Sequence, residues 1–204
     1  EAMPVLTPYG ELAVFFDVVP EFELLDRDLA ISGILAKYNR IDIETVIPDR
    51  APFSILERAI IFTNDEDRQC ALTLSRVEEK DCEGHIPEQS MVPLILLSKA
   101  MALTGRLLGG YLTKPGIVAE VIRTGPVSSL LSFSDLQYVK PPVCVLTLAQ
   151  LISQEKREMA TNCTSWIVAP GRFVPAGKIE ALTYALLPKE LLLRALRGRN
   201  YTHR

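Results

Sequence analysis

Residues 84–102, GHIPEQSMVPLILLSKAMA, join a histidine-containing turn to a long apolar run. His85 is one of only two histidines in the chain. Pro93 is favourable at the start of a helix, and the glycine pair at 109–110 is favourable at its end. A helix that is apolar on nearly every face is expected to be buried on all sides. The stretch therefore predicts one buried helix, with a histidine just ahead of it and one charge, Lys99, inside it.

Segments rich in β-forming residues flank this helix in the sequence. Ahead of it, residues 54–82 predict two strands around a polar turn at Asn64–Asp67. After it, further strands are predicted from partial apolar alternation, in segments 116–125, 129–142, 143–168 and 176–187. An antiparallel sheet that curls around one buried helix supplies apolar contacts to all of its faces. The predicted fold class is α+β.

The 204 residues suffice for one domain with an extension, and the chain divides into three regions. Residues 1–40 hold seven acidic and three basic side chains. Their composition predicts packing on the domain, with two short strands over 11–24 and a short helix over 26–38. Residues 41–187 form the predicted main domain. Residues 188–204 predict a basic amphipathic tail helix, with five basic residues and one acidic residue.

Composition excludes several classes of function. The net charge of −3 argues against nucleic acid as a partner, and no apolar run is long enough for a transmembrane helix. Four scattered cysteines and two histidines predict no metal site, and no cofactor is expected. Reduced cysteines favour a cytoplasmic protein. Cys82 lies three residues before His85, so a Cys–His nucleophile is one hypothesis, although a small buried side chain is the favoured interpretation.

Three segments together resemble the β-hydroxyacyl-acyl-carrier-protein dehydratases of the FabA/FabZ type, which have the hotdog fold. They are DIETVIPDRAPFSILERA (42–59), EGHIPEQSMVPLILLSKAMA (83–102) and LQYVKPPVCV (136–145). The order and spacing of the three agree with that family. The resemblance implies a hotdog domain in which the sheet wraps around the long helix.

The resemblance also implies a site. His85, next to Gly84, would act on the α-proton of a β-hydroxyacyl thioester. The backbone N–H of Leu94, directly after Pro93, would polarise the thioester carbonyl at the positive end of the helix. The substrate would be carried by acyl-carrier protein or coenzyme A, with its acyl chain in a tunnel along the helix. The family forms this tunnel at a dimer interface, so a homodimer is expected.

In the family an acidic residue of the long helix, contributed by the neighbouring subunit, handles the leaving hydroxyl. The sequence departs from the family at this second catalytic group, because the acidic residue falls on Lys99. Elimination of water needs a base for the α-proton and an acid for the leaving hydroxyl. Lysine can donate a proton, but it reverses the charge of the site. Glu83 and Glu88 are the nearby carboxylates that could take over the missing role.

Arg106 lies seven residues after Lys99 and hence near the same helix face. Two cations at this spacing predict binding of a carboxylate or phosphate group on a ligand. The alternatives are that Lys99 pairs with a carboxylate of the sheet and that Arg106 marks where the helix emerges into water.

Three hypotheses for the function follow from these residues. The first is a divergent dehydratase or related lyase centred on His85. The second is an acyl-binding or assembly protein that does not dehydrate its ligand. The third is a hotdog thioesterase that uses Glu83 or Glu88 to activate water.

Overall fold

The computed structural model describes residues 7–18, 21–47, 55–82 and 92–199. The helical elements are α1 (Pro8–Phe16), η1 (Phe22–Leu25), α2 (Asp26–Leu29), α3 (Arg40–Val46), α4 (Glu79–Cys82), α5 (Leu94–Leu112), η2 (Phe133–Tyr138) and α6 (Lys189–Arg199). The strands are β1 (Ile31–Asn39), β2 (Leu56–Asn64), β3 (Gln69–Val77), β4 (Ile117–Arg123), β5 (Val127–Ser129), β6 (Val143–Gln154), β7 (Glu158–Ala169) and β8 (Arg172–Pro188). No helix in these ranges is long and apolar enough to cross a membrane.

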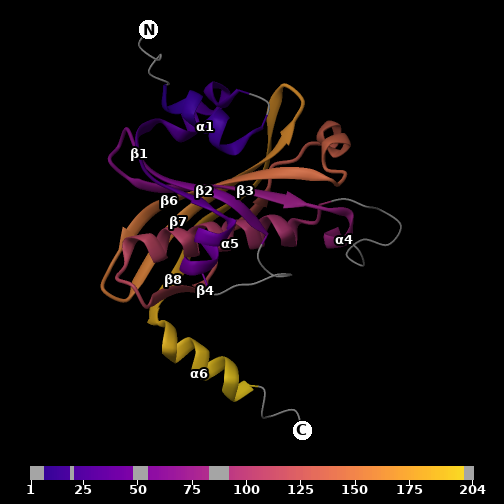
Figure 1. Ribbon diagram of the computed structural model, residues 1–204. Coiled ribbons are helices and arrows are strands. Elements are labelled where there is room, and N and C mark those ends of the chain that lie inside the picture. The colour runs from indigo at the N-terminus through magenta and orange to yellow at the C-terminus, as the bar shows by residue number, and fades with distance from the viewer. Residues whose placement is uncertain (1–6, 19–20, 48–54, 83–91, 200–204) are drawn as a thin grey trace.

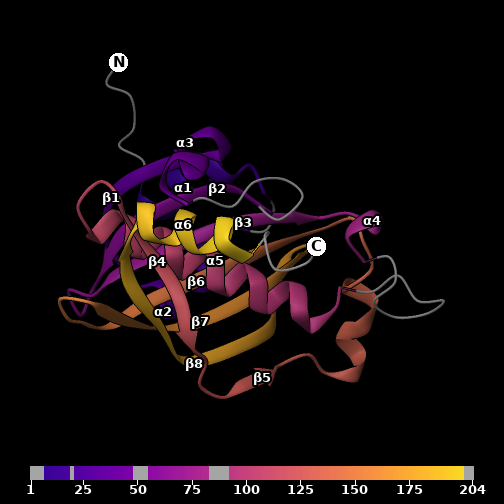
Figure 2. The same cartoon turned by 90° about the horizontal axis from the view of Figure 1, so that it is seen from below.

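One antiparallel sheet organises the molecule, with strand order β1-β2-β3-β6-β7-β8-β4 and β5 paired to β8. Figure 1 shows α5 against one face of this sheet and α1 with its neighbouring short helices against the other. Figure 2 shows the same sheet from below, with its strands curving past α5. The predicted α+β class, a sheet around one long helix, is confirmed.

α5 is buried along most of its length, as its apolar sequence predicts. Its buried residues are Leu97, Ala100, Met101, Leu103, Thr104, Gly105, Leu107, Leu108 and Gly109. A buried hydroxyl pair, Thr73 Oγ1 and Thr104 Oγ1 at 2.6 Å, joins β3 to the middle of the helix. The first turn differs from the prediction, because Leu94 and Ile95 are 41% and 61% exposed. The helix also continues past the expected glycine stop, to Leu112.

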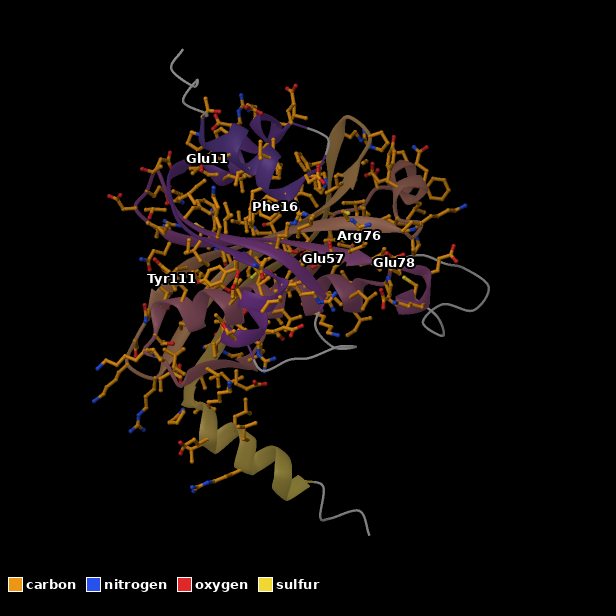
Figure 3. The ribbon with its side chains drawn as sticks, in the orientation of Figure 1. Glu11, Phe16, Glu57, Arg76, Glu78 and Tyr111 are labelled. Carbon is orange, nitrogen blue, oxygen red and sulfur yellow. The ribbon has the colours of Figure 1, made fainter. Side chains whose placement is uncertain are left out.

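The other face of the sheet is covered by residues 7–18 and 21–30, which we call the N-terminal layer. Five of its apolar side chains are fully buried, and they are Leu12, Phe16, Phe22, Leu25 and Leu29. They pack with outer-face residues of the sheet, among them Phe62, Leu72 and Trp166. Figure 3 shows Phe16 lying between α1 and the sheet, and its ring stacks on Phe22 at 5.5 Å. The sheet is therefore covered by a second apolar core on its outer face.

The prediction of two strands over 11–24 is wrong, because α1 and η1 occupy this stretch. Thr7 caps α1 by accepting a hydrogen bond from Gly10 N–H at 3.1 Å, and Pro8 follows at a favourable first position. Burial of one apolar face against the sheet then outweighs the β propensity of the phenylalanines and valines.

The predicted helix over 26–38 is also wrong beyond its first turn. α2 ends at Ala30, which has a left-handed φ of 44°, and the chain continues as β1. Since β1 pairs with β2, residues 31–39 belong to the sheet. The domain limits at residues 40 and 187 stay predictions.

The strands predicted on either side of the turn after Asn64 are confirmed as β2 and β3. The strand predicted over 129–142 is wrong, because only the edge of this segment belongs to β5 and the rest contains η2. A reciprocal cap explains the difference, since Asp135 accepts from Ser132 N–H at 3.0 Å and Ser132 caps the start of η2.

Gly105 permits the close approach of α5 to β8. A Cβ at this position would overlap the ring and hydroxyl of Tyr184, which is fully buried and cannot move aside. We expect Gly105→Ala to destabilise the protein by about 2 kcal/mol in a denaturant titration, because overpacking outweighs the gain in helix propensity. Gly33→Ala on β1 is the matched control, since its Cβ meets no atom within 4 Å. Equal stability of the two variants would contradict the prediction.

Candidate functional site

The N-terminus of α5 is the best-defined part of the candidate site. Pro93 stands at the N-cap with φ −74° and ψ 149°, and among the described residues no side chain caps the first turn. Val92 N–H donates to the carbonyl oxygen of Val139 at 3.0 Å, which fixes the approach to the helix. The first turn also contains no acidic residue. The Leu94 N–H therefore lies at a helix end whose partial positive charge no first-turn carboxylate offsets.

The histidine segment lies outside the described residues. This applies to Glu83, Gly84, His85 and Glu88. It applies equally to Asp49, in the segment that resembles the entry motif of the dehydratases. Their grouping around the start of α5 stays a prediction. The described residues on both sides, Cys82 and Val92, are buried in the same apolar cluster.

Lys99 lies on α5 and is half-buried, five residues after Leu94. This position agrees with the motif of residues 83–102, which puts Lys99 on the long helix that follows the histidine turn. Because Lys99 and Leu94 belong to one rigid helix, their separation along its axis is about 7.5 Å. Five residues also turn the helix by about 140°, so Lys99 and Leu94 do not share one face of α5.

Arg106 is held by the sheet. Its side chain is 14% exposed. The guanidinium forms an ion pair with Glu120 of β4 and donates from Nε to the carbonyl oxygen of Ala119 at 3.1 Å. This contact joins α5 to the edge strand of the sheet. The structure thus gives Arg106 a structural partner, and its predicted role in binding an anionic ligand stays a prediction.

A group of charged side chains near α4 was not singled out from the sequence. Figure 3 shows Glu57, Arg76 and Glu78 near this end of the sheet, and Arg76 Nε lies 3.5 Å from Glu57 Oε1. On β3, Thr73 faces α5, so Arg76, an odd number of positions away, faces the outside of the sheet. The Glu57–Arg76 pair is therefore on the wrong face to replace the missing acid beside α5.

Cys82 does not have the environment of a nucleophile. It is buried at the end of α4, and burial together with the nearby charge of Asp81 raises the pKa of its thiol. A raised pKa keeps the thiol protonated at neutral pH. The structure thus favours a small buried side chain over a Cys–His pair. Across the described ranges, no group of three or more His, Cys, Asp or Glu residues could hold a metal ion.

Ser75 is a buried polar group on the α5 side of β3. Its hydroxyl is fully buried and has no hydrogen-bond partner among the described residues. We expect Ser75→Ala to stabilise the protein by up to about 1 kcal/mol, because it removes an unsatisfied buried hydroxyl. Ser165→Ala is the matched control, since Ser165 Oγ bonds Thr147 Oγ1 at 3.2 Å and its loss is expected to destabilise. Thermal unfolding of both variants measures the contrast, and a destabilised Ser75→Ala would refute the prediction.

Comparisons with known proteins agree with this arrangement. No family model matches the chain. 3-Hydroxyacyl-acyl-carrier-protein dehydratase FabZ of Magnetococcus marinus is 28% identical over 120 residues, which cover 58% of this chain and 74% of that enzyme. FabZ of Francisella tularensis subsp. novicida is 24% identical over 143 residues, covering 68% of this chain and 88% of that enzyme. Among solved structures, the dehydratase heterocomplex ApeI:P from Xenorhabdus doucetiae matches 76% of this chain and 96% of its own, with a TM-score of 0.51 and 14% identity.

The single long helix, the antiparallel sheet around it and the structural match define a hotdog-fold protein. Within this class the sequence matches are to FabZ, and they are distant. The chain is therefore a divergent, FabZ-like hotdog protein, as its three motifs predict.

Proposed function

We propose that this protein acts on acyl thioesters as a divergent 3-hydroxyacyl-thioester dehydratase. The observation that carries the proposal is the similarity to FabZ across most of that enzyme's length, in a chain whose hotdog helix starts directly behind the histidine motif. The first turn of α5 supports it, because its N-cap is a proline without a capping side chain and its backbone N–H groups can donate to a thioester carbonyl.

Three groups of the chain have roles in the proposed reaction. His85 removes a proton from the α-carbon, and the electron pair moves onto the thioester carbonyl oxygen, which the Leu94 N–H stabilises. The enolate then collapses to a carbon–carbon double bond while the bond to the β-hydroxyl breaks. Lys99, contributed by the second subunit of the proposed dimer, gives that oxygen a proton, so it leaves as water. Each group thus handles one proton or one developing charge.

The thioester carrier and the assembly belong to the same proposal. The acyl group is carried by acyl-carrier protein or coenzyme A, and no separate cofactor is needed for an elimination of this kind. A homodimer is proposed, because the FabZ-like arrangement completes its site between two subunits. The exposed apolar first turn of α5, with Leu94 and Ile95, supports the burial of this end against another chain. The cytoplasmic location remains part of the proposal.

Lys99 favours a second candidate, an acyl-thioester-binding protein that does not dehydrate its ligand. The family's carboxylate is replaced by a cation, and Leu94 replaces a glycine at the point where the thioester approaches the backbone. Both changes leave a binding surface along α5. The first alters the group that would act on the leaving hydroxyl, and the second narrows the approach of the thioester to the backbone.

A panel of short and long 3-hydroxyacyl thioesters, on coenzyme A and on acyl-carrier protein, tests these functions. Mass spectrometry reads the loss of one water or the hydrolysis of the thioester. We expect loss of water with intact thioester. Tight binding with unchanged ligand would select the second candidate, and hydrolysis would select a thioesterase. If the protein neither bound nor converted any thioester of the panel, the proposed function would be refuted altogether.

A further inference from the structure

The C-terminal helix α6 stands away from the rest of the molecule. Figure 1 shows α6 continuing from β8 and pointing away from the sheet and α5. Within the described residues its main contact is with β8, the strand it follows. Leu191 and Leu193 near its start are exposed. A helix of 11 residues is marginal in water on its own, so α6 gains stability if a surface covers it.

The chemistry of α6 defines the surface that would suit it. Its segment, 188–204, has five basic residues and one acidic residue. Of its described side chains, Lys189 and Arg194 are cationic, Glu190 is anionic, and the exposed leucines are apolar. A complementary surface therefore combines exposed apolar side chains with carboxylates.

The N-terminal layer presents such a surface. Its exposed carboxylates are Asp17, Glu21, Glu23, Asp26 and Asp28, and Arg27 is its exposed cation. Val14 and Leu24 add apolar surface, because both are more than half exposed. The layer is firmly attached, since Arg58 Nη1 of β2 donates to the carbonyl oxygen of Phe15 at 2.6 Å. It is thus a preformed acidic and apolar face.

These two surfaces cannot meet within one molecule. Figure 1 shows the N-terminal layer at one end and α6 projecting from the opposite end, with the sheet and α5 between them. We propose that α6 of one copy docks on the N-terminal layer of another copy of this chain. The contact is head to tail, so it uses two different surfaces and builds rings or open chains of molecules. It is independent of the proposed reaction and of the proposed homodimer.

Charge exchange between the two surfaces tests this contact in the full-length protein. The tail variant is Lys189→Glu/Arg194→Glu, and the layer variant is Glu21→Lys/Glu23→Lys. Light scattering and sedimentation measure the association constant at low and at high salt. We expect the wild-type protein to form species larger than a dimer at low salt and to lose them at high salt. Each variant alone is expected to weaken this association about tenfold.

Recombination of the variants separates a specific contact from a general charge effect. A mixture of the tail variant with the layer variant restores association, because the reversed surfaces complement each other. Lys156→Glu, an exposed lysine between β6 and β7, is the charge control and leaves association unchanged. Circular dichroism checks that all variants keep their helices. Failure of the mixture to associate would overturn the proposal. The proposal would also be overturned if the molecular mass of the wild-type species were the same at low and at high salt. Binding of the protein to anionic phospholipid vesicles without any self-association would overturn it as well.

Discussion

His85→Ala is expected to lower the dehydration of a 3-hydroxyacyl thioester about a thousandfold. General base catalysis by a positioned side chain supplies a factor of this order, and alanine has no group that can accept the α-proton. His203 is the other histidine of the chain, and it lies far along the sequence in the basic tail. The measurement is the rate of water loss at saturating substrate, read by mass.

Two comparisons make this result specific to catalysis. His85→Ala is expected to keep wild-type thermal stability and dimer mass, and to bind the same thioester with unchanged affinity. Cys82→Ala is the matched control, because Cys82 lies three residues away in sequence and is assigned a packing role. Unchanged turnover in His85→Ala would show that His85 takes no part in the reaction, although the histidine motif is present in the sequence.

The central helix and the strands beside it could be predicted from the sequence because local pattern and tertiary environment agree there. An apolar run such as 94–108 is stable only when buried. β2 and β3 are rich in β-forming residues and flank a turn formed by polar residues. The N-terminal layer could not be predicted in the same way. Its phenylalanines and valines have β propensity, and their helical state depends on a sheet face formed by residues far along the chain.

That layer also explains the composition of the outer sheet face. Leu72, Leu74 and Trp166 would be exposed in a sheet covered on one side only, yet all three are nearly fully buried. Fully burying one such side chain contributes roughly 1.5–3 kcal/mol. Residues 7–18 and 21–30 are therefore part of the folded core, and their acidic side chains are left to form the outer surface.

The candidate site was predictable only in part, for a different reason. Motif order places His85, Leu94 and Lys99 in sequence, and the structure confirms that Leu94 starts the helix that carries Lys99. Spacing alone does not reveal the partner of a side chain on another element. Arg106 shows this, since its contacts with Ala119 and Glu120 on β4 arise only from the packing of α5 against the sheet edge.

Lys99 is the residue on which the proposed chemistry depends most. A leaving hydroxyl needs a proton donor, and the proposed reaction assigns this task to Lys99. Lys99→Met keeps most of the apolar stem of the side chain and removes the ammonium group, with its charge and its protons. We expect this variant to bind the thioester and to lower dehydration about a hundredfold, within the range for loss of a general acid. The measurement is turnover alongside thioester affinity, and full activity in Lys99→Met would remove lysine from the mechanism.

Lys99→Glu gives the complementary result. It restores the carboxylate of the FabZ-like pattern at the same point of α5, where partial burial disfavours the charged form of a carboxyl group and so raises its pKa. A carboxyl group in its neutral form holds a proton that it can give to the leaving hydroxyl, as in other paired acid–base sites. We expect dehydration at least about tenfold faster than in Lys99→Met, and faster than in the wild-type protein. Lys99→Gln, of equal size and without a titratable proton, is the control. If Lys99→Glu and Lys99→Gln were equally slow, the remaining site would not support dehydration, and the binding function would be the better account of the fold.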